Sequence, residues 1–373
     1  MFSEIIIFVR VTNTQLMKKI IVLYSAMIFL TGCFTPKSIS VDKKDIEENP
    51  NLIEASPGYY LEFIGLKNYT AQQVVDSMKA KQVKTLIGAQ VLNACSAVME
   101  KDLGFAHSST NYVKPNYGYI TLIESKKGYG IIEKDIPDDT VATNVNWNIE
   151  GKDLSNFENR TALHFFIQFL RTDGEKINMR YKLIYNQYAE DTEKEFSNGL
   201  IDHLNSLNLS TELPLARKTL KSDGNLVNRY WALLIMMRTV PNDEDIELLL
   251  DQYYYDDNRL KSYTSYVLRE TLKLRDDIPW TRYSAQIQNL LNGAAIWNYD
   301  LIIDFLKDNN MDYGQSSKVF NPASPILSDY LNAYESSKSK KALDFIKKVS
   351  SGTVNSKAEA NQWLAQQYQK YLN

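Results

Sequence analysis

Histidines and hydroxyls are the residues of this chain best suited to acid–base and nucleophilic chemistry. His107 precedes Ser108 and Ser109, and a hydroxyl beside a histidine base is the usual arrangement for an activated nucleophile. That chemistry needs spatial contact and an oriented imidazole, which adjacency along the chain does not supply. His164 and His203 fall on polar faces of expected helices, where exposed side chains are ordinary. The sequence therefore predicts no catalytic set.

Metal and cofactor motifs are also missing from the sequence. It has no Gly-x-Ser-x-Gly elbow, no His-Glu-x-x-His, no phosphate loop and no Gly-x-Gly-x-x-Gly. Its acid pairs, such as Asp256-Asp257, are adjacent and do not alternate as calcium ligands do. With only Cys33 and Cys95, no cysteine metal cluster can form. We predict neither a metal nor a cofactor.

The N-terminal region carries the most specific pattern. Lys18 and Lys19 precede an apolar run, Ile20–Leu30, which is too short to cross a bilayer but suits the hydrophobic part of a signal peptide. The run ends in Leu30-Thr31-Gly32-Cys33, an apolar residue, two small residues and a cysteine. Residues 17–33 thus resemble the signal peptide and lipobox of bacterial lipoproteins. The alternative is a buried helix that ends in Gly-Cys.

The resemblance implies an address for the protein. A lipoprotein signal over residues 17–32 is removed and Cys33 receives acyl chains, which anchor the protein in a membrane. Phe34 after the cysteine implies the outer membrane of a bacterial cell envelope, with the body facing the periplasm. Residues 1–16 precede a suitable initiator at Met17, so they are expected to be a start-site extension; a true start at Met1 is the alternative.

Charge limits the classes of partner. Removal of residues 1–32 takes away three basic residues and one acidic residue, which leaves 39 basic and 44 acidic residues and a net charge of −5. Nucleic-acid binding needs a basic surface, so we predict no nucleic-acid partner.

Two parts follow the expected signal. Residues 33–56 have little apolar periodicity and read as a lipidated N-terminus and flexible tether. Residues 57–151 predict a small α+β domain, with a strand over 59–64, a helix after Thr70 and a hairpin that pairs Tyr117–Glu124 with Tyr129–Lys134. Residues 144–149 could add a strand, and His107 falls in an expected loop.

The rest of the chain, residues 152–373, predicts helices almost throughout. Capping-box patterns at Ser155, Thr192 and Ser356 mark helix starts. From about 213 to 350, helices that begin after a proline alternate with helices that begin after an aspartate turn. This region resembles HEAT-like repeats, in which stacked helical pairs form an α-solenoid. The alternative is an irregular bundle.

Function is predicted from these parts together. Tyr253, Tyr254 and Tyr255 cannot all face one core, so they form a candidate surface for a protein or peptide partner. We therefore expect a lipid-anchored scaffold or binding module without catalytic activity. The alternatives are a hydrolase of an envelope polymer that uses His107, Ser108 or Ser109 and Glu133, or a protective protein that blocks a toxic enzyme.

Overall fold

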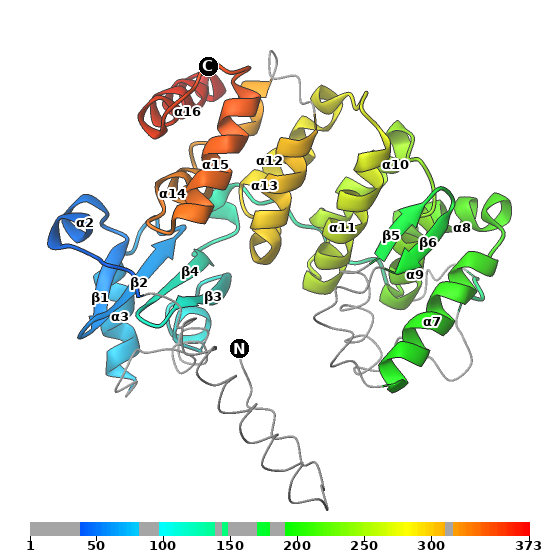
Figure 1. Ribbon diagram of the computed structural model, residues 1–373, viewed down its shortest axis with the longest axis horizontal. Coiled ribbons are helices and arrows are strands. Elements are labelled where there is room, and N and C mark those ends of the chain that lie inside the picture. The colour runs from blue at the N-terminus through cyan, green and yellow to red at the C-terminus, as the bar shows by residue number, and fades with distance from the viewer. Residues whose placement is uncertain (1–37, 82–96, 139–143, 148–169, 180–190, 310–315) are drawn as a thin grey trace, which may run out of the picture.

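The computed structural model describes residues 38–81, 97–138, 144–147, 170–179, 191–309 and 316–373. A small N-terminal sheet of four strands is followed by a C-terminal array of helices (Figure 1), which confirms the predicted α+β class with a helical C-terminal part. The expected signal peptide, start site and Cys33 lie outside the described residues, as do Cys95 and His164.

The sheet has a parallel pair in its centre and an antiparallel pair on each side. Its order is β1-β2-β4-β3, with β1 at Leu52–Ser56, β2 at Tyr59–Ile64, β3 at His107–Lys114 and β4 at Tyr117–Ile123. Side chains alternate between two cores, as the pleat requires. Phe63 and Leu122 pack into a cluster with α3 (Ala71–Ala80), whereas Ile64 and Ile123 join the core of the helical array.

The segment before the sheet is part of the folded body. α2 (Lys43–Glu48) and β1 both lie within the expected tether over 33–56, so that tether was predicted too long. Asn116, which follows β3, binds both main-chain groups of Ile39: its Oδ1 accepts from Ile39 N–H at 2.9 Å and its Nδ2 donates to Ile39 O at 2.8 Å. The described chain is therefore held against the sheet almost from its beginning.

The predicted hairpin is wrong in its partner strand. β4 pairs with β3, and residues 129–134 form no strand with β4. A single 3₁₀ turn, Lys127–Tyr129, ends in Gly130 at φ +69°, a left-handed conformation that directs the chain away from the sheet. His107 opens β3 and so lies in a strand, contrary to the expected loop. Residues 144–147 are also not a strand.

The array consists of helices in two layers. Contacts run from α9 to α11, α13 and α15 in one layer. In the other layer α8 contacts α10, and the 3₁₀ turn that follows α10, Gln252–Tyr254, contacts α12. This neighbour pattern is the one expected of an α-solenoid. The helices are α7 (Asp191–Ser206), α8 (Leu209–Ser222), α9 (Leu226–Met236), α10 (Asp243–Asp251), α11 (Asn258–Thr271), α12 (Ser284–Leu291), α13 (Tyr299–Asp308), α14 (Ile326–Asn332), α15 (Ser336–Val349) and α16 (Lys357–Leu372).

Side-chain caps explain where several of these helices begin. Asp257 and Ser356 accept hydrogen bonds from main-chain N–H groups in the first turns of α11 and α16, as predicted, and Asn225 does the same for α9. Within the described part of 152–373, the expectation of helices almost throughout is wrong at a hairpin. β5 (Leu170–Asp173) and β6 (Lys176–Met179) form a hairpin that packs on α7 and α11.

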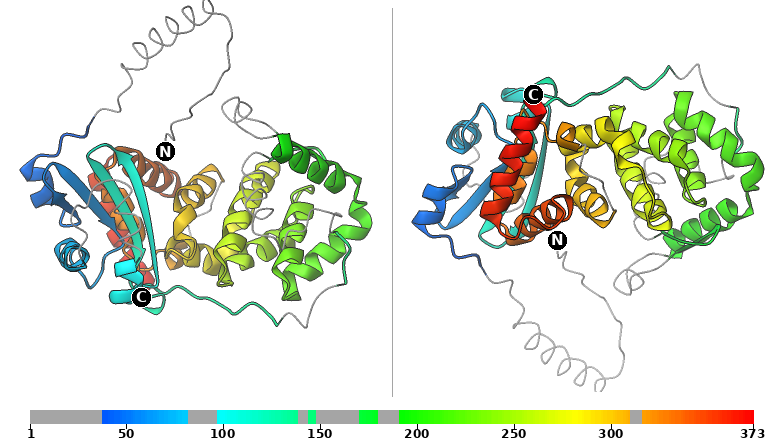
Figure 2. Two further views of the ribbon diagram at one scale, coloured as in Figure 1. Left: turned by 90° about the horizontal axis from the view of Figure 1, so that it is seen from below. Right: turned by 90° about the horizontal axis from the view of Figure 1, so that it is seen from above.

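An extended segment connects the sheet with the far end of the array. We call residues 129–138 the strap; it leaves the sheet after β4 and runs along one side of the helices (Figure 2). Tyr129 and Ile131 are buried at its start. Further along the chain, buried Trp147 donates to Glu212 on α8 at 2.7 Å and its carbonyl contacts His203 Nε2 at 2.9 Å.

The sheet also contacts the other end of the array. Gly65 N–H donates to Asp329 on α14 at 2.7 Å, and Tyr334 N–H donates to buried Glu62 on β2 at 2.7 Å. Tyr117 donates from its hydroxyl to the second oxygen of Glu62. The sheet, the strap and the array therefore form a closed circuit, because the last helices return to the first strands.

Candidate functional site

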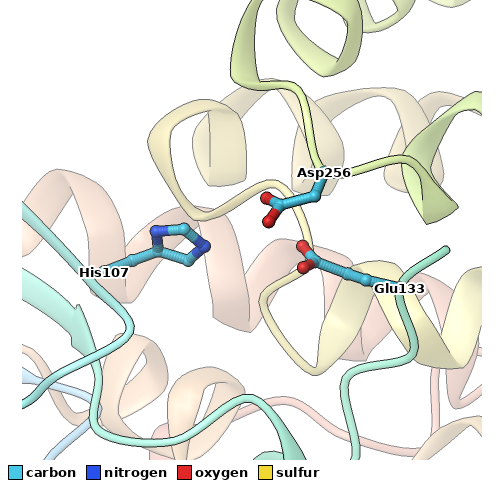
Figure 3. Close-up of side chains that lie close together, drawn as sticks. All are labelled: His107, Glu133 and Asp256. Atoms are coloured by element: carbon cyan, nitrogen blue, oxygen red, sulfur yellow. The ribbon is translucent and has the colours of Figure 1, made fainter. Parts of the chain in front are cut away.

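His107, Glu133 and Asp256 meet where the sheet, the strap and the array come together (Figure 3). One ligand atom from each lies within 4.8 Å of the other two, and the distal nitrogen of the imidazole points toward both carboxylates. These residues are 26 and 123 positions apart along the chain, so only the fold brings them together.

Three elements position the cluster. His107 is the first residue of β3 and pairs with Ile123 of β4. Glu133 lies in the strap, and Asp256 lies in the turn before α11. A parallel β-bridge between Lys134 and Tyr255 sets the strap beside this turn: Lys134 N–H donates to Tyr254 O at 2.5 Å, and Asp256 N–H donates to Lys134 O at 3.3 Å. The bridge thus brings Glu133, next to Lys134, and Asp256, next to Tyr255, into the cluster.

Two lysines balance the charge of the two carboxylates. Lys126 Nζ contacts Glu133 Oε2 at 2.5 Å and Asp256 Oδ2 at 3.0 Å, while Lys261 Nζ from α11 contacts Glu133 Oε1 at 2.5 Å. Lys261 is 1 % exposed, so its ammonium depends on Glu133 for compensation. Burial alone would raise the pKa of Asp256, but the hydrogen bond and charge of Lys126 hold that pKa below its ordinary value.

His107 is held neutral in this environment. Burial, followed by the charges of Lys126 and Lys261, lowers the pKa of His107 to about 4, although Glu133 and Asp256 act in the opposite direction. Its Nε2 is buried without a hydrogen-bond partner among the described residues. Its ring meets Trp297 edge to face, with 4.5 Å between centroids. The imidazole is therefore a neutral group fixed by packing.

The donor set by itself is one that a transition metal could use, since a neutral imidazole and two carboxylates are ordinary ligands. The two ammonium groups oppose this use, because they already occupy three of the four carboxylate oxygens. A divalent cation would have to displace them or add to their charge. The geometry favours an ion-pair junction over a metal centre.

The hydroxyls predicted for a hydrolase do not join His107. Ser108 is the next residue in β3, so its side chain points to the opposite face of the sheet. Its Oγ donates to Glu100 Oε1 at 3.0 Å. Ser109 lies on the face of His107 but roughly 7 Å further along the strand. The structure thus brings together His107 and Glu133 of the predicted hydrolase set and leaves out Ser108.

The three tyrosines contact the strap and neighbouring parts of the same chain. Tyr253 is buried and hydrogen-bonds Ser265 at 2.8 Å. Tyr254 is buried, and the Lys134 ammonium lies over its ring at 4.9 Å. Tyr255 is half-buried, with the Arg229 guanidinium 4.2 Å from its ring centroid. In this structure the predicted partner surface is therefore an intramolecular one.

Asparagine side chains provide a second recurring feature, in which one amide binds both main-chain groups of an isoleucine. Asn289 on α12 accepts from Ile132 N–H at 2.8 Å and donates to Ile132 O at 3.0 Å. Asn205 on α7 does the same to Ile177 of β6, at 2.9 and 3.0 Å, and Asn116 to Ile39. We call these contacts the amide clamps.

Sequence reasoning missed most of this site. The sequence predicts only a turn at Asp256, and no motif marks Lys126, Lys261 or Asn289. His203 was expected at the surface but is half-buried against Trp147 and Trp231. Lys261 has polar residues at helical spacing on both sides, such as Asn258 and Ser265, so the sequence held no signal that it would be buried.

Comparison with protein-family models, with curated proteins and with solved structures found no match to this chain. Among the residues that the structure describes, none of the helices combines the length and the apolar character needed to span a bilayer. The function of this protein therefore has to be inferred from the geometry and chemistry of the chain itself.

Proposed function

We propose that this protein is a lipid-anchored component of a bacterial cell envelope whose helical array binds a protein or peptide partner without catalysis. Cys33 would carry the anchor, and the body would face the periplasm from the outer membrane. The proposal for the anchor is supported by the lipobox pattern alone. The proposal for binding is supported by the hydrogen bonds through which helices of the array hold extended segments of the same chain.

The observation that carries the proposal is the recognition of main chain by the amide clamps. An amide that binds both N–H and C=O of one residue holds an extended segment whatever its side chain. Two of the clamps come from helices of the array, Asn289 on α12 and Asn205 on α7. An array that holds two extended segments of its own chain this way has the chemistry needed to hold those of another protein.

Photo-crosslinking from the array tests the proposal. A photoreactive amino acid would replace exposed Val240 or Trp297 on the array, or exposed Lys79 on α3 as the matched control, in the full chain in cells. We expect a discrete adduct from an array position and none from position 79. Adducts from neither array position, with the protein folded and membrane-bound, would refute the binding role.

A hydrolase is the second candidate, because the structure unites His107 and Glu133 at the junction of sheet and array. The pKa of about 4 makes His107 a weak base, which counts against this reading. Purified protein and its His107→Gln variant would be incubated with peptidoglycan and envelope glycans. Product release by the wild type that the variant lacks would establish the hydrolase; equal, background release would remove it.

A further inference from the structure

The strap is bound differently in its middle than at its two ends. Tyr129 and Ile131 at its start, and Trp147 beyond it, are buried apolar anchors. Between them Ile132 is 52 % exposed, and Lys134 and Asp135 are also exposed. The middle is thus held by main-chain and charge contacts with little apolar burial. Such a segment has few of the buried apolar contacts that oppose local opening.

We call the surface that contacts residues 132–134 of the strap the groove. It binds three consecutive residues of the strap, each through a different kind of contact. Asn289 binds the main chain at the first position. Lys261 and Lys126 bind a carboxylate at the second. The backbone at Tyr254 and Asp256 binds the main chain at the third, where the Tyr254 ring also faces a cation.

We propose that this groove is the recognition site for an extended segment of a partner protein that contains an acidic residue followed directly by a basic residue. The strap occupies the groove as an internal ligand until the partner segment replaces it. This inference rests on the proposed binding function and names its site and its ligand. The charge of the groove indicates why its ligand must be acidic. Lys261 is buried, so an empty groove would leave its ammonium without a counter-charge.

The same charge makes the exchange selective. A segment that lacks the acid would leave Lys261 uncompensated, and a basic residue in its place would meet two ammonium groups. The strap is tethered at both ends, which gives it an effective concentration on the order of millimolar against a free competitor. Binding in trans should therefore be weak for the wild-type protein and much stronger when the strap is loosened.

Fluorescence anisotropy with a labelled peptide of sequence Tyr-Gly-Ile-Ile-Glu-Lys-Asp-Ile-Pro-Asp, that of residues 129–138, tests the inference on the full chain. In the variant Glu133→Lys the strap is repelled from the lysines while the groove is intact. We expect at least a tenfold lower Kd than for the wild type. Asp135→Lys, an identical charge change at an exposed strap position, should bind as the wild type does, and a peptide with lysine at its fifth position should bind none of the proteins.

Equal peptide affinity for Glu133→Lys, Asp135→Lys and wild-type protein would overturn the inference. If Glu133→Lys fails to fold by circular dichroism, Ile132→Pro decides instead, because proline removes the N–H that the strap donates to Asn289 and restricts the backbone of the strap there. It should also bind the peptide more tightly than the wild type, and unchanged affinity would reject the site. Failure here leaves the photo-crosslinking result intact, since a partner could use another face of the array.

Discussion

Two half-buried side chains at the junctions of this molecule have pKa values far from their ordinary ones. His107 is neutral because burial and two lysines disfavour its cation. Asp329 on α14 is half-buried near Glu62, and desolvation raises the pKa of Asp329 to about 7 although Gly65 N–H donates to it. The two residues therefore predict pH effects of opposite sign.

His107 should make the fold less stable in acid. A histidine with a lowered pKa stabilises the fold above its unfolded pKa of about 6.5, and this contribution is lost as the pH falls toward 4. After allowance for solvent screening, we expect His107→Gln to reduce the loss of unfolding free energy between pH 7 and pH 4.5 by about 1 to 2 kcal/mol. Urea unfolding at several pH values measures it; parallel profiles for the two proteins would contradict the assignment.

Asp329 should act in the other direction. A carboxyl with a raised pKa stabilises the fold below about pH 4, and this contribution is lost as the pH rises through 7. Asp329→Asn keeps an oxygen for Gly65 N–H but cannot ionise. We expect it to match the wild type at pH 4 and to exceed its unfolding free energy by about 2 kcal/mol at pH 8. A deficit at pH 8 in thermal or urea unfolding would show that the charged form is preferred.

At the scale of elements, the contact between β2 and α14 depends on a glycine. Gly65 has φ +102°, its carbonyl accepts from the Tyr129 hydroxyl, and an added Cβ would lie 2.3 Å from Leu122 O and 2.6 Å from Ile326 Cδ1. We expect Gly65→Ala to lower the unfolding free energy by about 3 kcal/mol or more, from strain and overpacking. Gly58→Ala is the control: its φ is +73° in open space, so it should cost only about 1 kcal/mol. Equal losses would deny a packing role to Gly65.

The strap depends on α12 in a similar way. Asn289→Ala removes both hydrogen bonds to Ile132 and should lower the unfolding free energy by about 1 to 3 kcal/mol, because the asparagine is buried and its partners lose their contacts. Trypsin should then cleave after Lys134 faster than in the wild type. Asn332→Ala, which removes exposed amide contacts with Asn361, is the control. It should change the unfolding free energy by no more than about 0.5 kcal/mol and leave the rate of cleavage after Lys134 unchanged.

At the scale of the whole molecule, the closed circuit of sheet, strap and array should limit bending of the helical array. The strap contacts α12, the turn before α11 and, near Pro137 and Asp138, Gly224 at the start of α9. Any change in the curvature of the array would have to break these contacts. While the strap is bound, the protein should therefore present its helical surface in a nearly constant shape.

Membrane attachment belongs to this scale as well. The described body begins at Ser38, five residues after Cys33, so a lipid on Cys33 would hold it within roughly 17 Å of the bilayer surface. We expect Cys33→Ser to move the protein from the membrane fraction into the soluble fraction, with loss of the acyl mass from the N-terminal peptide. Wild-type protein with an unmodified Cys33 thiol by mass spectrometry would refute the anchor.

The sequence by itself determined the local features: the cap residues of α11 and α16, the strand β2 and the capping box of α3. These depend on neighbours within a few positions, where steric and hydrogen-bonding preferences act directly. Only the tertiary structure decided that residues 129–134 leave the sheet for the array, because a single bridge and one asparagine outweigh their hairpin pattern. It also decided the junction of His107, Glu133, Asp256 and the two lysines. Charges separated by more than a hundred residues meet only when the solenoid curves back to the sheet, and no spacing rule in the sequence encodes that return.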